Sequence, residues 1–489
     1  MATTVQTSTS TDQSDRHYID GRVVAATGAE GLAVTDPATG QERGSVVPAT
    51  EEEVAAAVAA AHGTRAMWRA TPPPERAAAL RRAAAAVRAE AGRLGELLAA
   101  TTGRLLSQST ESAAVAADLL EEAATSGLGP AGRTLAGSAS AIDAVRREPH
   151  GVVAVITPWN DPFPAAAGLL AAALVTGNTV VHKPSERSAL PGFEMGRIIA
   201  EALPPGVLNV LTGDGRSGTA ITTDERVALV AHVGSTTAGQ RIAAAAGARG
   251  GRVLLENGGK DPVVVDAGVE PAWAAQQIAL GAFVNTGQLC TSVERVYLHA
   301  DVADAVVAEL VALADRMVVG PPTEPATEIG PLVDERQLEV VARHVRDAAE
   351  AGARVLVGGR RLDRPGSYFP PTVLDGCTAD MALMREETFG PVAAVTRVTT
   401  FDEALDLAGS GRYGLAATVL TPDLGHALRA VEELEVGTVK VNAVFGGAPG
   451  GSADPRRDSG MGPGYGPDLL SAMTVLKTVH LEPARTARS

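Results

Sequence analysis

Five short apolar segments, each separated from the next by enough chain for a helix, recur through the middle of the sequence. They read GVVAVIT, TVVHK, VLNVL, VALVAHV and RVLLE, and they begin at residues 151, 179, 207, 227 and 252. Parallel strands need such crossover connections, and the helices then bury the sheet on both faces. A sheet of this kind binds ligands at the carboxyl ends of its strands, and a nucleotide is the first expectation.

A second α/β series follows residue 256. Its strand-like segments read PVVVD, RVYLH, ARVLVGG, PVAAVTRV, AATVL and GTVKVN. Helices are expected at 271–285, 301–317 and 334–351, between these segments. A second domain with its own sheet is the simplest interpretation.

The two ends of the chain do not show this alternation of strands and helices. Helices are expected at 51–62, 75–100 and 111–125, before the first series. Residues 127–140, rich in Gly, Pro and Ser, suit an exposed arm. The last segment, TVLKTVHLE, has no local partner, so we expect it to pair with 141–148 or with the sheet edge of another subunit. An unpaired strand of this kind predicts that the chain forms a homodimer or homotetramer.

Charge and composition limit the partners. Across 489 residues the formal net charge is −15 and no basic block stands out, so we expect no nucleic-acid partner. The longest apolar run, AAAGLLAAALV at 165–175, is shorter than the roughly 20 residues of a membrane span. Two cysteines cannot form a disulfide framework and no secretory leader is visible, so a cytoplasmic location is expected.

One of the two cysteines, Cys290, lies between a helix-like apolar run and the strand-like RVYLHA. A turn at this place exposes a thiol to backbone N–H groups, which suits a nucleophile. A lone cysteine is more often a buried structural residue, and Cys377 keeps that interpretation. The role of Cys290 therefore depends on the groups that the rest of the chain brings to it.

Several polar residues follow predicted strands or lie on loops. Asn160 follows the first strand and can donate to an oxyanion, and Glu256 ends the fifth strand before two glycines. Lys183 and Glu186 end the second strand and could bond ribose hydroxyls, and Glu387 lies on a later loop beside a phenylalanine. Each has a plain structural alternative: a helix cap, a turn, a surface ion pair or a solvated chain segment.

Two glycine motifs could approach a phosphate. The segment 213–218 fits G-x-G-x-x-G after a strand, but no acidic residue closes the next strand, so we interpret it as a turn. Gly234 and Ser235 end the fourth strand and open a helix expected at 236–246. Backbone N–H groups and a hydroxyl would face an anion there.

Taken together, these segments resemble a known family. The motifs TPWN, KPSE, GST, E-x-GGK, GQ-x-C and EE-x-FGPV occur in this order, and the chain from about residue 17 to 480 resembles the aldehyde dehydrogenase superfamily of the hydrolytic, non-acylating type. The resemblance implies an α/β fold with a Rossmann-like dinucleotide domain, an α/β catalytic domain and a β arm for oligomerisation. The expected boundaries are a disordered lead-in at 1–16, the dinucleotide-binding domain at 17–128 and 149–256, the catalytic domain at 257–440, and the arm with the C-terminal segment at 129–148 and 441–489.

In the mechanism that the resemblance implies, the Cys290 thiolate adds to an aldehyde, and the Asn160 amide and the Cys290 N–H hold the oxyanion. Hydride transfer to the nicotinamide leaves a thioester, and water activated by Glu256 hydrolyses it to the acid. The presence of this base disfavours coenzyme A as acceptor and disfavours reduction of an acyl phosphate.

The implied cofactor is NAD, because a carboxylate at Glu186 would repel the 2′-phosphate of NADP. Lys183 and Glu186 would bind the adenosine ribose, Ser235 the pyrophosphate, and Glu387 the nicotinamide ribose. No metal is expected. The expected cofactor residues are Thr157, Trp159, Lys183, Ser185, Glu186, Gly215, Gly234, Ser235, Glu387 and Phe389.

Three positions depart from the family pattern. Val233 stands where a threonine is usual, and Asn257 stands where a leucine is usual. Leu169 stands where a lysine often supports deacylation. Altered cofactor affinity is expected, and a catalytically impaired homologue is one alternative.

The expected substrate pocket departs further from the family. A carboxylate and small side chains on the helix after Asn160, with a C-terminal loop rich in Arg and Asp, predict a wide polar tunnel and a bulky, hydroxyl-bearing or amine-bearing aldehyde. A succinate-semialdehyde-type activity is the other alternative, because Arg456 or Arg457 could meet a carboxylate. Glyceraldehyde-3-phosphate is disfavoured as substrate, because Leu289 stands where phosphate-binding relatives in the family carry an arginine. The expected pocket residues are Asp161, Ala165, Gly168, Leu289, Thr291, Phe445 and Ala453.

Overall fold

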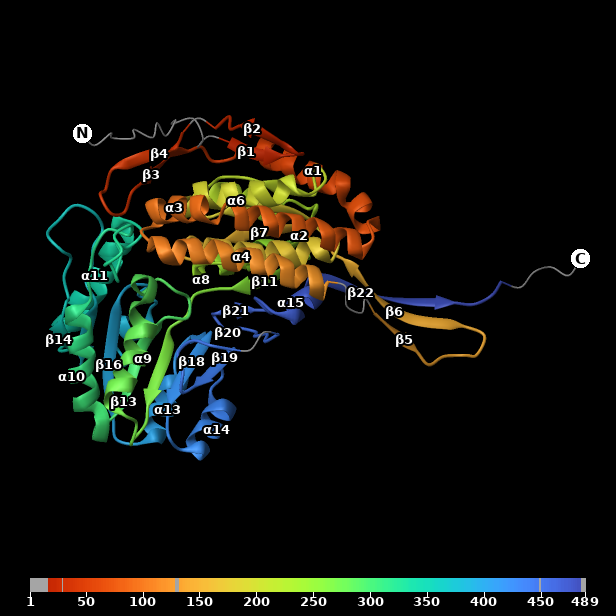
Figure 1. The fold of residues 1–489 in the computed structure, drawn as a ribbon. Coiled ribbons are helices and arrows are strands. Elements are labelled where there is room, and N and C mark those ends of the chain that lie inside the picture. Colours follow the sequence, from red (N-terminus) through yellow and green to blue (C-terminus); the bar gives the residue numbers. More distant parts are fainter. Residues whose placement is uncertain (1–15, 29, 128–131, 448–449, 485–489) are drawn as a thin grey trace, which may run out of the picture.

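The computed structural model of the chain describes residues 16–28, 30–127, 132–447 and 450–484. Two large sheets are packed between helices, and a three-stranded sheet projects from one side of the molecule (Figure 1). The predicted α/β fold is confirmed. Residues 1–15, nearly all of the expected disordered lead-in, lie outside the described residues, and Arg16 already belongs to the first strand.

The five segments of the first series form the parallel centre of the first sheet. Their spatial order is β9 (Leu208–Val210), β8 (Thr179–Pro184), β7 (Val152–Thr157), β10 (Val227–Val233) and β11 (Arg252–Glu256). Antiparallel strands extend both edges, namely β1 (Arg16–Ile19) and β2 (Arg22–Ala25) beside β9, and β21 (Gly460–Met461) beside β11.

Helices cover both faces of this sheet, as parallel crossover connections require. One core contains side chains from α2 (Pro73–Ala89), α3 (Ala91–Thr102), α4 (Leu106–Ser126), α5 (Pro162–Val175) and α6 (Ala189–Glu201). The core on the other face contains side chains from α1 (Glu51–Ala70), α7 (Gly215–Thr223) and α8 (Thr236–Ala248). The helix expected from residue 236 is thus confirmed.

The first predicted helix is too short, because a tertiary contact lengthens it. It was expected to end at residue 62 and continues to Ala70. Trp68 is buried in its last turn, and the Trp68 Nε1–H donates to the Leu174 carbonyl at 3.0 Å. Similarly, α4 starts at Leu106 instead of residue 111.

The single helix expected at 75–100 is wrong. Glu90 leaves the helical conformation and separates α2 from α3. Gly95 on α3 lies so close to α4 that a Cβ there would be 2.4 Å from the Thr110 hydroxyl oxygen. This close helix contact sets a new direction for α3, and the Ala-rich sequence before it contains no local stop signal.

The second series forms the second sheet. Its spatial order is β14 (Arg354–Val357), β15 (Thr372–Asp375), β16 (Val392–Val398), β13 (Val293–His299), β12 (Asp261–Val265), β18 (Ala416–Leu420) and β19 (Thr438–Val441). Only β14 and β15 pair antiparallel among these described strands. Strand β15, whose four residues follow two prolines, was not predicted from the sequence.

Five helices cover the second sheet. On one face lie α9 (Pro271–Phe283) and α10 (Ala300–Arg316), and on the other α11 (Glu335–Glu350), α13 (Phe401–Gly409) and α14 (Leu424–Glu433). The helix expected at 271–285 ends at Phe283, because left-handed residues follow it. The short elements are β3 (Leu32–Thr35), β4 (Glu42–Val46), α12 (Ala382–Arg385), β17 (Tyr413–Gly414), β20 (Arg456–Arg457), α15 (Pro467–Ala472) and the 3₁₀ turns Glu186–Ser188 and Val284–Gly287.

The projecting sheet contains β5 (Gly132–Leu135), β6 (Ile142–Pro149) and β22 (Thr474–Leu481) (Figure 1). Strand β22 runs antiparallel to β6 along its whole length, so the expected pairing with 141–148 is confirmed. Ile142, Leu476 and Leu481 on this sheet are exposed. In the part of the chain that the structure describes, no helix is long and apolar enough to cross a membrane.

Gly287, before Cys290, allows a close approach between two loops. Its φ is +69°, and a Cβ there would lie 2.1 Å from the Gly390 carbonyl oxygen. We expect Gly287→Ala to lower the free energy of unfolding by about 2 kcal/mol or more, because it adds a backbone collision to left-handed strain. Chemical denaturation measures this loss. The control is Gly352→Ala, where φ is +107° and no atom lies within 4 Å of the Cβ position. Equal losses in the two variants would contradict the collision.

Candidate active site

A cavity of about 1040 Å³ lies where the carboxyl ends of the first sheet meet loops of the second α/β unit. Residues after β7, β8, β10 and β11 line it, together with the Cys290 turn and the loop before β16. All thirteen of the expected catalytic and cofactor residues lie in this lining: Cys290, Glu256, Asn160, Thr157, Trp159, Lys183, Ser185, Glu186, Gly215, Gly234, Ser235, Glu387 and Phe389.

Cys290 lies in the turn between α9 and β13. The chain leaves helical geometry at Asn285 and Thr286, whose φ angles are 50° and 58°. The Cys290 Sγ then lies 3.8 Å from Oε1 of Glu256, the last residue of β11. A thiol from one α/β unit therefore faces a carboxylate from the other.

The Asn160 side chain is buried beside the same turn. Its Nδ2 donates to the Gln288 carbonyl at 3.0 Å, and Asn285 Nδ2 donates to the Asn160 carbonyl at 3.2 Å. A primary amide has two N–H donors, so one remains available to a ligand oxygen. The hydrogen bond to Gln288 orients the amide in advance, as stabilisation of an oxyanion requires, and the bond from Asn285 holds the Asn160 backbone.

Burial and negative charge both oppose ionisation of the thiol. Burial raises the pKa of Cys290 well above its usual range, and the charges of Glu256, Asp261 and Glu387 act in the same direction. Burial also raises the pKa of Glu256, although the hydrogen bond with the thiol opposes this. Burial and the charge of Glu294 raise the pKa of Glu387 to about 8. The protein without ligand therefore holds Cys290 as a neutral thiol at pH 7.

The N-termini of α7 and α8 point their free N–H groups toward one part of the cavity. Asp214 caps α7 by accepting the Arg216 N–H at 2.9 Å, and Ser235 caps α8 by accepting the Ala238 N–H at 3.3 Å. Gly215 and Gly234 lie at these two helix starts and line the cavity. A helix N-terminus suits an anionic ligand, and α8, whose cap is the neutral Ser235 hydroxyl, fits one better than α7, whose cap is the Asp214 carboxylate.

Lys183 and Glu186 do not form the surface ion pair that was one interpretation of the sequence. Lys183 is buried, and its Nζ donates to the carbonyl oxygens of Pro184 and Gly213 at 3.0 and 2.9 Å. Burial lowers the pKa of this amine, and the charge of Glu186 opposes the shift. Glu186 is exposed at the cavity edge. An ammonium group with three donors keeps one N–H for a ligand here.

His232 places a neutral imidazole at the cavity. The residue is 5% exposed and lines the cavity. Burial lowers the pKa of His232 to about 4 and the charge of Lys183 adds to the effect, whereas hydrogen bonds with the backbone of Ser235 and Ile156 oppose it. A neutral imidazole offers one donor and one acceptor. The helix N-termini, the Lys183 ammonium group and this ring together fit the phosphate oxygens and ribose hydroxyls of a dinucleotide.

Two aromatic rings from different units meet at the cavity. The rings of Trp159 and Phe389 make an edge contact, with centroids 5.5 Å apart and planes at 76°. Arg187 lies 5.5 Å from the centre of the Trp159 ring and pairs with Asp334 at 3.0 Å. These contacts connect the two units beside the cofactor residues.

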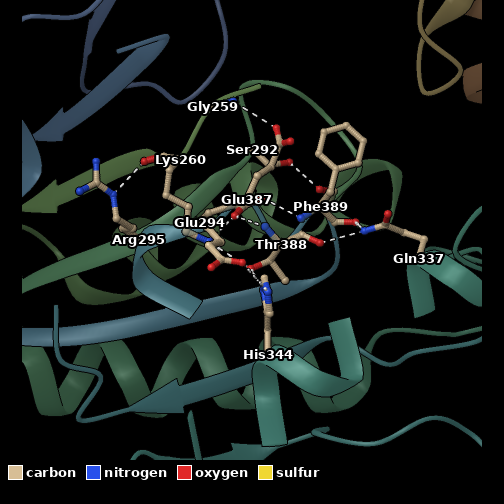
Figure 2. Close-up of polar contacts among 12 residues, drawn as sticks. Gly259, Lys260, Ser292, Glu294, Arg295, Gln337, His344, Glu387, Thr388 and Phe389 are labelled. Carbon is tan, nitrogen blue, oxygen red and sulfur yellow. Dashed lines mark hydrogen bonds and ion pairs between the residues drawn. The ribbon is translucent and has the colours of Figure 1, made fainter. Parts of the chain in front are cut away.

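The loop that carries Glu387 is held by buried polar contacts (Figure 2). Glu387 Oε1 accepts the Gly259 N–H at 3.1 Å. The Glu294 carboxylate accepts the N–H groups of Thr388 and Phe389, both at 2.8 Å. The loop is thereby tied to the connection between β11 and β12.

The other end of the cavity is bounded by α4, α5 and residues around α15. Ala165 and Gly168 on α5 line it, and so does Asp161. Asp161 Oδ1 accepts the Ser112 hydroxyl at 2.7 Å and pairs with Arg104 at 3.0 Å. The small side chains leave this end wide, and a carboxylate makes it polar.

Four expected pocket residues are not brought to this cavity. In the described chain, its lining does not include Leu289, Thr291, Phe445 or Ala453. Leu289 and Thr291 flank Cys290, and successive side chains of a turn point in different directions. Phe445 packs against the core of the second unit.

The three departures from the family pattern take ordinary places in the structure. Leu169 lies on α5 and is buried in the core. Val233 packs against the same core and also lines the cavity. Asn257 Nδ2 donates to the Asp458 carbonyl at 3.0 Å, so this side chain ties the end of β11 to the C-terminal segment.

The sequence analysis assigned no function to several side chains that lie at the site. For His232, a polar residue inside an otherwise apolar strand was the available signal. For Glu122 on α4 and Arg104 in the connection between α3 and α4 no signal existed, because charged residues at such places usually face water. The missed residues are Arg104, Glu122, His232, Glu294 and Tyr465.

Comparison with known proteins agrees with this site. The model of the aldehyde dehydrogenase family matches residues 23–479. A betaine aldehyde dehydrogenase of Cereibacter sphaeroides is 38% identical over 433 residues, which cover 87% of this chain and 89% of that protein. The crystal structure of lactaldehyde dehydrogenase from Escherichia coli superposes with a TM-score of 0.93, at 32% identity, over 96% of this chain and 99% of that one. A crystal structure of PnpE in complex with nicotinamide adenine dinucleotide has the same TM-score at 30% identity, over 97% and 99% of the two chains.

The chain therefore belongs to the aldehyde dehydrogenase family. It is an oxidoreductase that acts on aldehydes, in a family that uses NAD or NADP. The family predicted from the order of six short motifs is confirmed.

The electrostatics of the cavity predict how fast Cys290 is alkylated without cofactor. Replacing Glu256 with Gln removes a negative charge near the sulfur, so the pKa of Cys290 should fall. We expect Glu256→Gln to react several-fold faster with iodoacetamide at pH 8, measured by peptide mass spectrometry. Cys377 serves as an internal control, because burial raises its pKa to about 12. A slower reaction at Cys290 would contradict the electrostatic effect of Glu256.

Proposed function

We propose that this chain oxidises an aldehyde to the carboxylic acid, with Cys290 as nucleophile, Glu256 as base and Asn160 as oxyanion donor. The observation that carries the proposal is the 3.8 Å contact between Cys290 Sγ and Glu256 Oε1 in a cavity that Asn160 also lines. Membership in the family supports it.

The side chains divide the work as follows. The thiolate sulfur forms a bond to the aldehyde carbon, and Asn160 Nδ2 and the Cys290 N–H donate to the resulting oxyanion of the thiohemiacetal. When bound, the dinucleotide would supply a positive ring that favours the thiolate, and it would accept the hydride whose loss from the thiohemiacetal carbon leaves the thioester. Glu256 takes a proton from the water that attacks the thioester, and the acid leaves as the thiol is restored. Leu169 stands where a lysine often supports deacylation, and it cannot take part in proton transfer. Glu256 therefore accepts this proton without help from that position.

The dinucleotide would lie against the helix N-termini at Gly215 and Ser235. Thr157, Trp159, Lys183, Ser185, Gly234, Glu387 and Phe389 complete the proposed binding set. We propose NAD rather than NADP, because the exposed Glu186 carboxylate at the cavity edge would repel a 2′-phosphate.

We further propose a bulky substrate with an amine or a hydroxyl group. Asp161 and Glu122 both place carboxylates on the α4–α5 end of the cavity. Arg104 neutralises Asp161, whereas Glu122 has no hydrogen bond or ion pair with the rest of the described chain. A free carboxylate at this end of the cavity favours a cationic group, and one relative is named betaine aldehyde dehydrogenase.

The two alternatives have less support. A succinate-semialdehyde activity was suggested by Arg456 and Arg457, which lie outside the cavity lining among the described residues. Arg457 is bound to Glu435 at 2.6 Å. An impaired homologue has no support at the thiol, the base or the amide, since all three side chains line one cavity.

We also propose that the projecting sheet assembles the chain into a homodimer or homotetramer. Its exposed Ile142, Leu476 and Leu481 would otherwise remain in water. Both cysteines are free thiols, which suits the reducing cytoplasm.

The role of Glu256 predicts a kinetic signature. Glu256→Gln should release about one equivalent of NADH per active site in a rapid phase, because addition and hydride transfer do not need the hydrolytic base. Steady turnover should then fall by about 100-fold or more. Stopped-flow absorbance at saturating NAD measures both phases, and Cys290→Ser is the control that gives no burst. A folded Glu256→Gln protein without a burst would contradict the assignment.

The free Glu122 carboxylate at the α4–α5 end of the cavity predicts a substrate preference. We expect kcat/KM to be higher for aldehydes with an amine than for propanal, and Glu122→Gln to lower it for the cationic aldehydes by about three- to tenfold. For neutral aldehydes the same variant should change little. Glu121→Gln is the matched control, one residue away on α4, because Glu121 lies outside the cavity lining. Equal losses for cationic and neutral aldehydes would refute the electrostatic selection.

A further inference from the structure

The loop of Glu387, Thr388 and Phe389 has a backbone that needs support. Phe389 has a φ of +54°, a left-handed conformation that bulky residues rarely adopt. Such conformations persist where the surroundings over-determine them. The loop also presents two side chains, Glu387 and Phe389, to the cavity. Its shape therefore matters for the cofactor half of the site.

Both peptide groups beside Phe389 are held by side chains (Figure 2). The two carboxylate oxygens of Glu294 each accept one N–H, from Thr388 and from Phe389, at 2.8 Å. Gln337 Nε2 donates to the carbonyl oxygens of the same two residues, at 2.9 and 3.1 Å. Glu294 comes from β13 and Gln337 from α11, so two elements grip the loop from different directions.

Glu294 is a buried charge with a buried partner. Glu294 and Lys260 are 4% and 3% exposed, and their side chains form an ion pair. Lys260 Nζ also donates to the Thr388 hydroxyl at 3.1 Å, and His344 Nδ1 lies 3.2 Å from that hydroxyl. A buried ion pair is often no more stabilising than apolar residues of similar size. Stability alone is therefore a weak reason for this pair.

The same pair connects the segment after β11 with the loop that carries Glu387. Lys260 follows Gly259, whose N–H binds Glu387. A Cβ at Gly258 would lie 2.6 Å from the Glu387 carboxylate oxygens, so the backbone passes directly over that group. The segment that begins with the base Glu256 is thus joined to the loop of Glu387 through Glu294 and Lys260.

We propose that Glu294 is a positioning residue for the cofactor half of the site: it holds the Thr388–Phe389 backbone so that Glu387 and Phe389 face the cavity, with Lys260 as its counter-charge. Glu294 itself lies outside the cavity lining among the described residues, so it acts through the loop. The inference rests on the proposed function to the extent that Glu387 and Phe389 contact the dinucleotide.

The first test is direct binding of NAD to the full chain, measured by isothermal titration calorimetry. Glu294→Gln keeps the shape of the side chain but leaves one acceptor oxygen in place of two. It also removes the charge that faces Lys260. We expect Glu294→Gln to raise the Kd for NAD about tenfold. Alkylation of Cys290 without cofactor should stay within about twofold of the wild-type rate. An unchanged Kd in the folded variant would overturn the proposal and leave Glu294 a purely structural residue.

Asp375→Asn is the matched control for loss of a buried carboxylate. Asp375 lies on β15 of the same sheet, is 1% exposed and pairs with Arg354 and Arg397. It lies outside the cavity lining in the described chain. We expect this variant to unfold at a lower temperature and to bind NAD with the wild-type Kd. A tenfold weaker Kd here as well would show that general loosening of the sheet explains the effect.

A double-mutant cycle tests the route through Glu387. If Glu294 acts by placing the Glu387 carboxylate, Glu387→Gln and Glu294→Gln should each weaken NAD binding about tenfold relative to the wild type. The double variant should also bind about tenfold more weakly than the wild type, and not a hundredfold. Independent, multiplying effects would overturn the proposed route. Should Glu294→Gln fail to fold, the combination with Lys260→Met removes both charges and avoids an unpaired buried ion. Wild-type NAD affinity in that folded pair would also overturn the proposal.

Failure of the proposed function looks different. Wild-type protein that neither binds NAD nor forms NADH with any aldehyde would refute the activity itself. Wild-type protein that does both, combined with an unaffected Glu294→Gln variant, would refute only the positioning role.

Discussion

The site depends on one short connection, the residues between Glu256 at the end of β11 and Asp261 at the start of β12. The chain passes here from the first sheet to the second. A Cβ at Gly258 or Gly259 would approach neighbouring atoms within 2.6 or 2.7 Å, so these positions admit no side chain without a shift. The connection therefore fixes Glu256 of the first sheet relative to the Cys290 turn and the Glu387 loop of the second. A longer or bulkier connection would let the two halves of the cavity separate.

The same compactness creates an electrostatic cost in the protein without ligand. The partly buried Glu256 and Glu387 and the buried Asp261 lie around one thiol, and burial raises the pKa of each. Well below the unfolded-state pKa values of about 4, all three are protonated in both the folded and the unfolded chain and cost nothing. As the pH rises toward the folded pKa values, about 8 for Glu387 and Asp261, they oppose folding, because the unfolded chain releases their protons more easily. A cationic ring beside these carboxylates would relieve the cost, which couples cofactor binding to the stability of the site.

Local sequence predicted the parts of the site that depend on local structure. Asn160, Lys183, Ser235 and Glu256 each directly follow a buried strand or end it, and parallel strands bring their carboxyl ends to one edge. Their meeting in one cavity needed no knowledge of helix packing. Leu289 and Thr291 show the limit of this reasoning, because nearness in sequence to Cys290 did not place their side chains on the cavity.

The sequence by itself determined the family, the two α/β series, the strand ends that carry Asn160 and Glu256, and the partner of the last strand. These follow from hydrophobic periodicity and from short motifs, which are local. Only the tertiary structure decided where α2 ends, that β15 exists, that Arg104 and Ser112 bind Asp161, and that Glu294 holds the Phe389 backbone. The physical reason is distance along the chain: Glu294 and Thr388 are separated by 94 residues, and a carboxylate carries no local mark of which distant N–H groups it will accept.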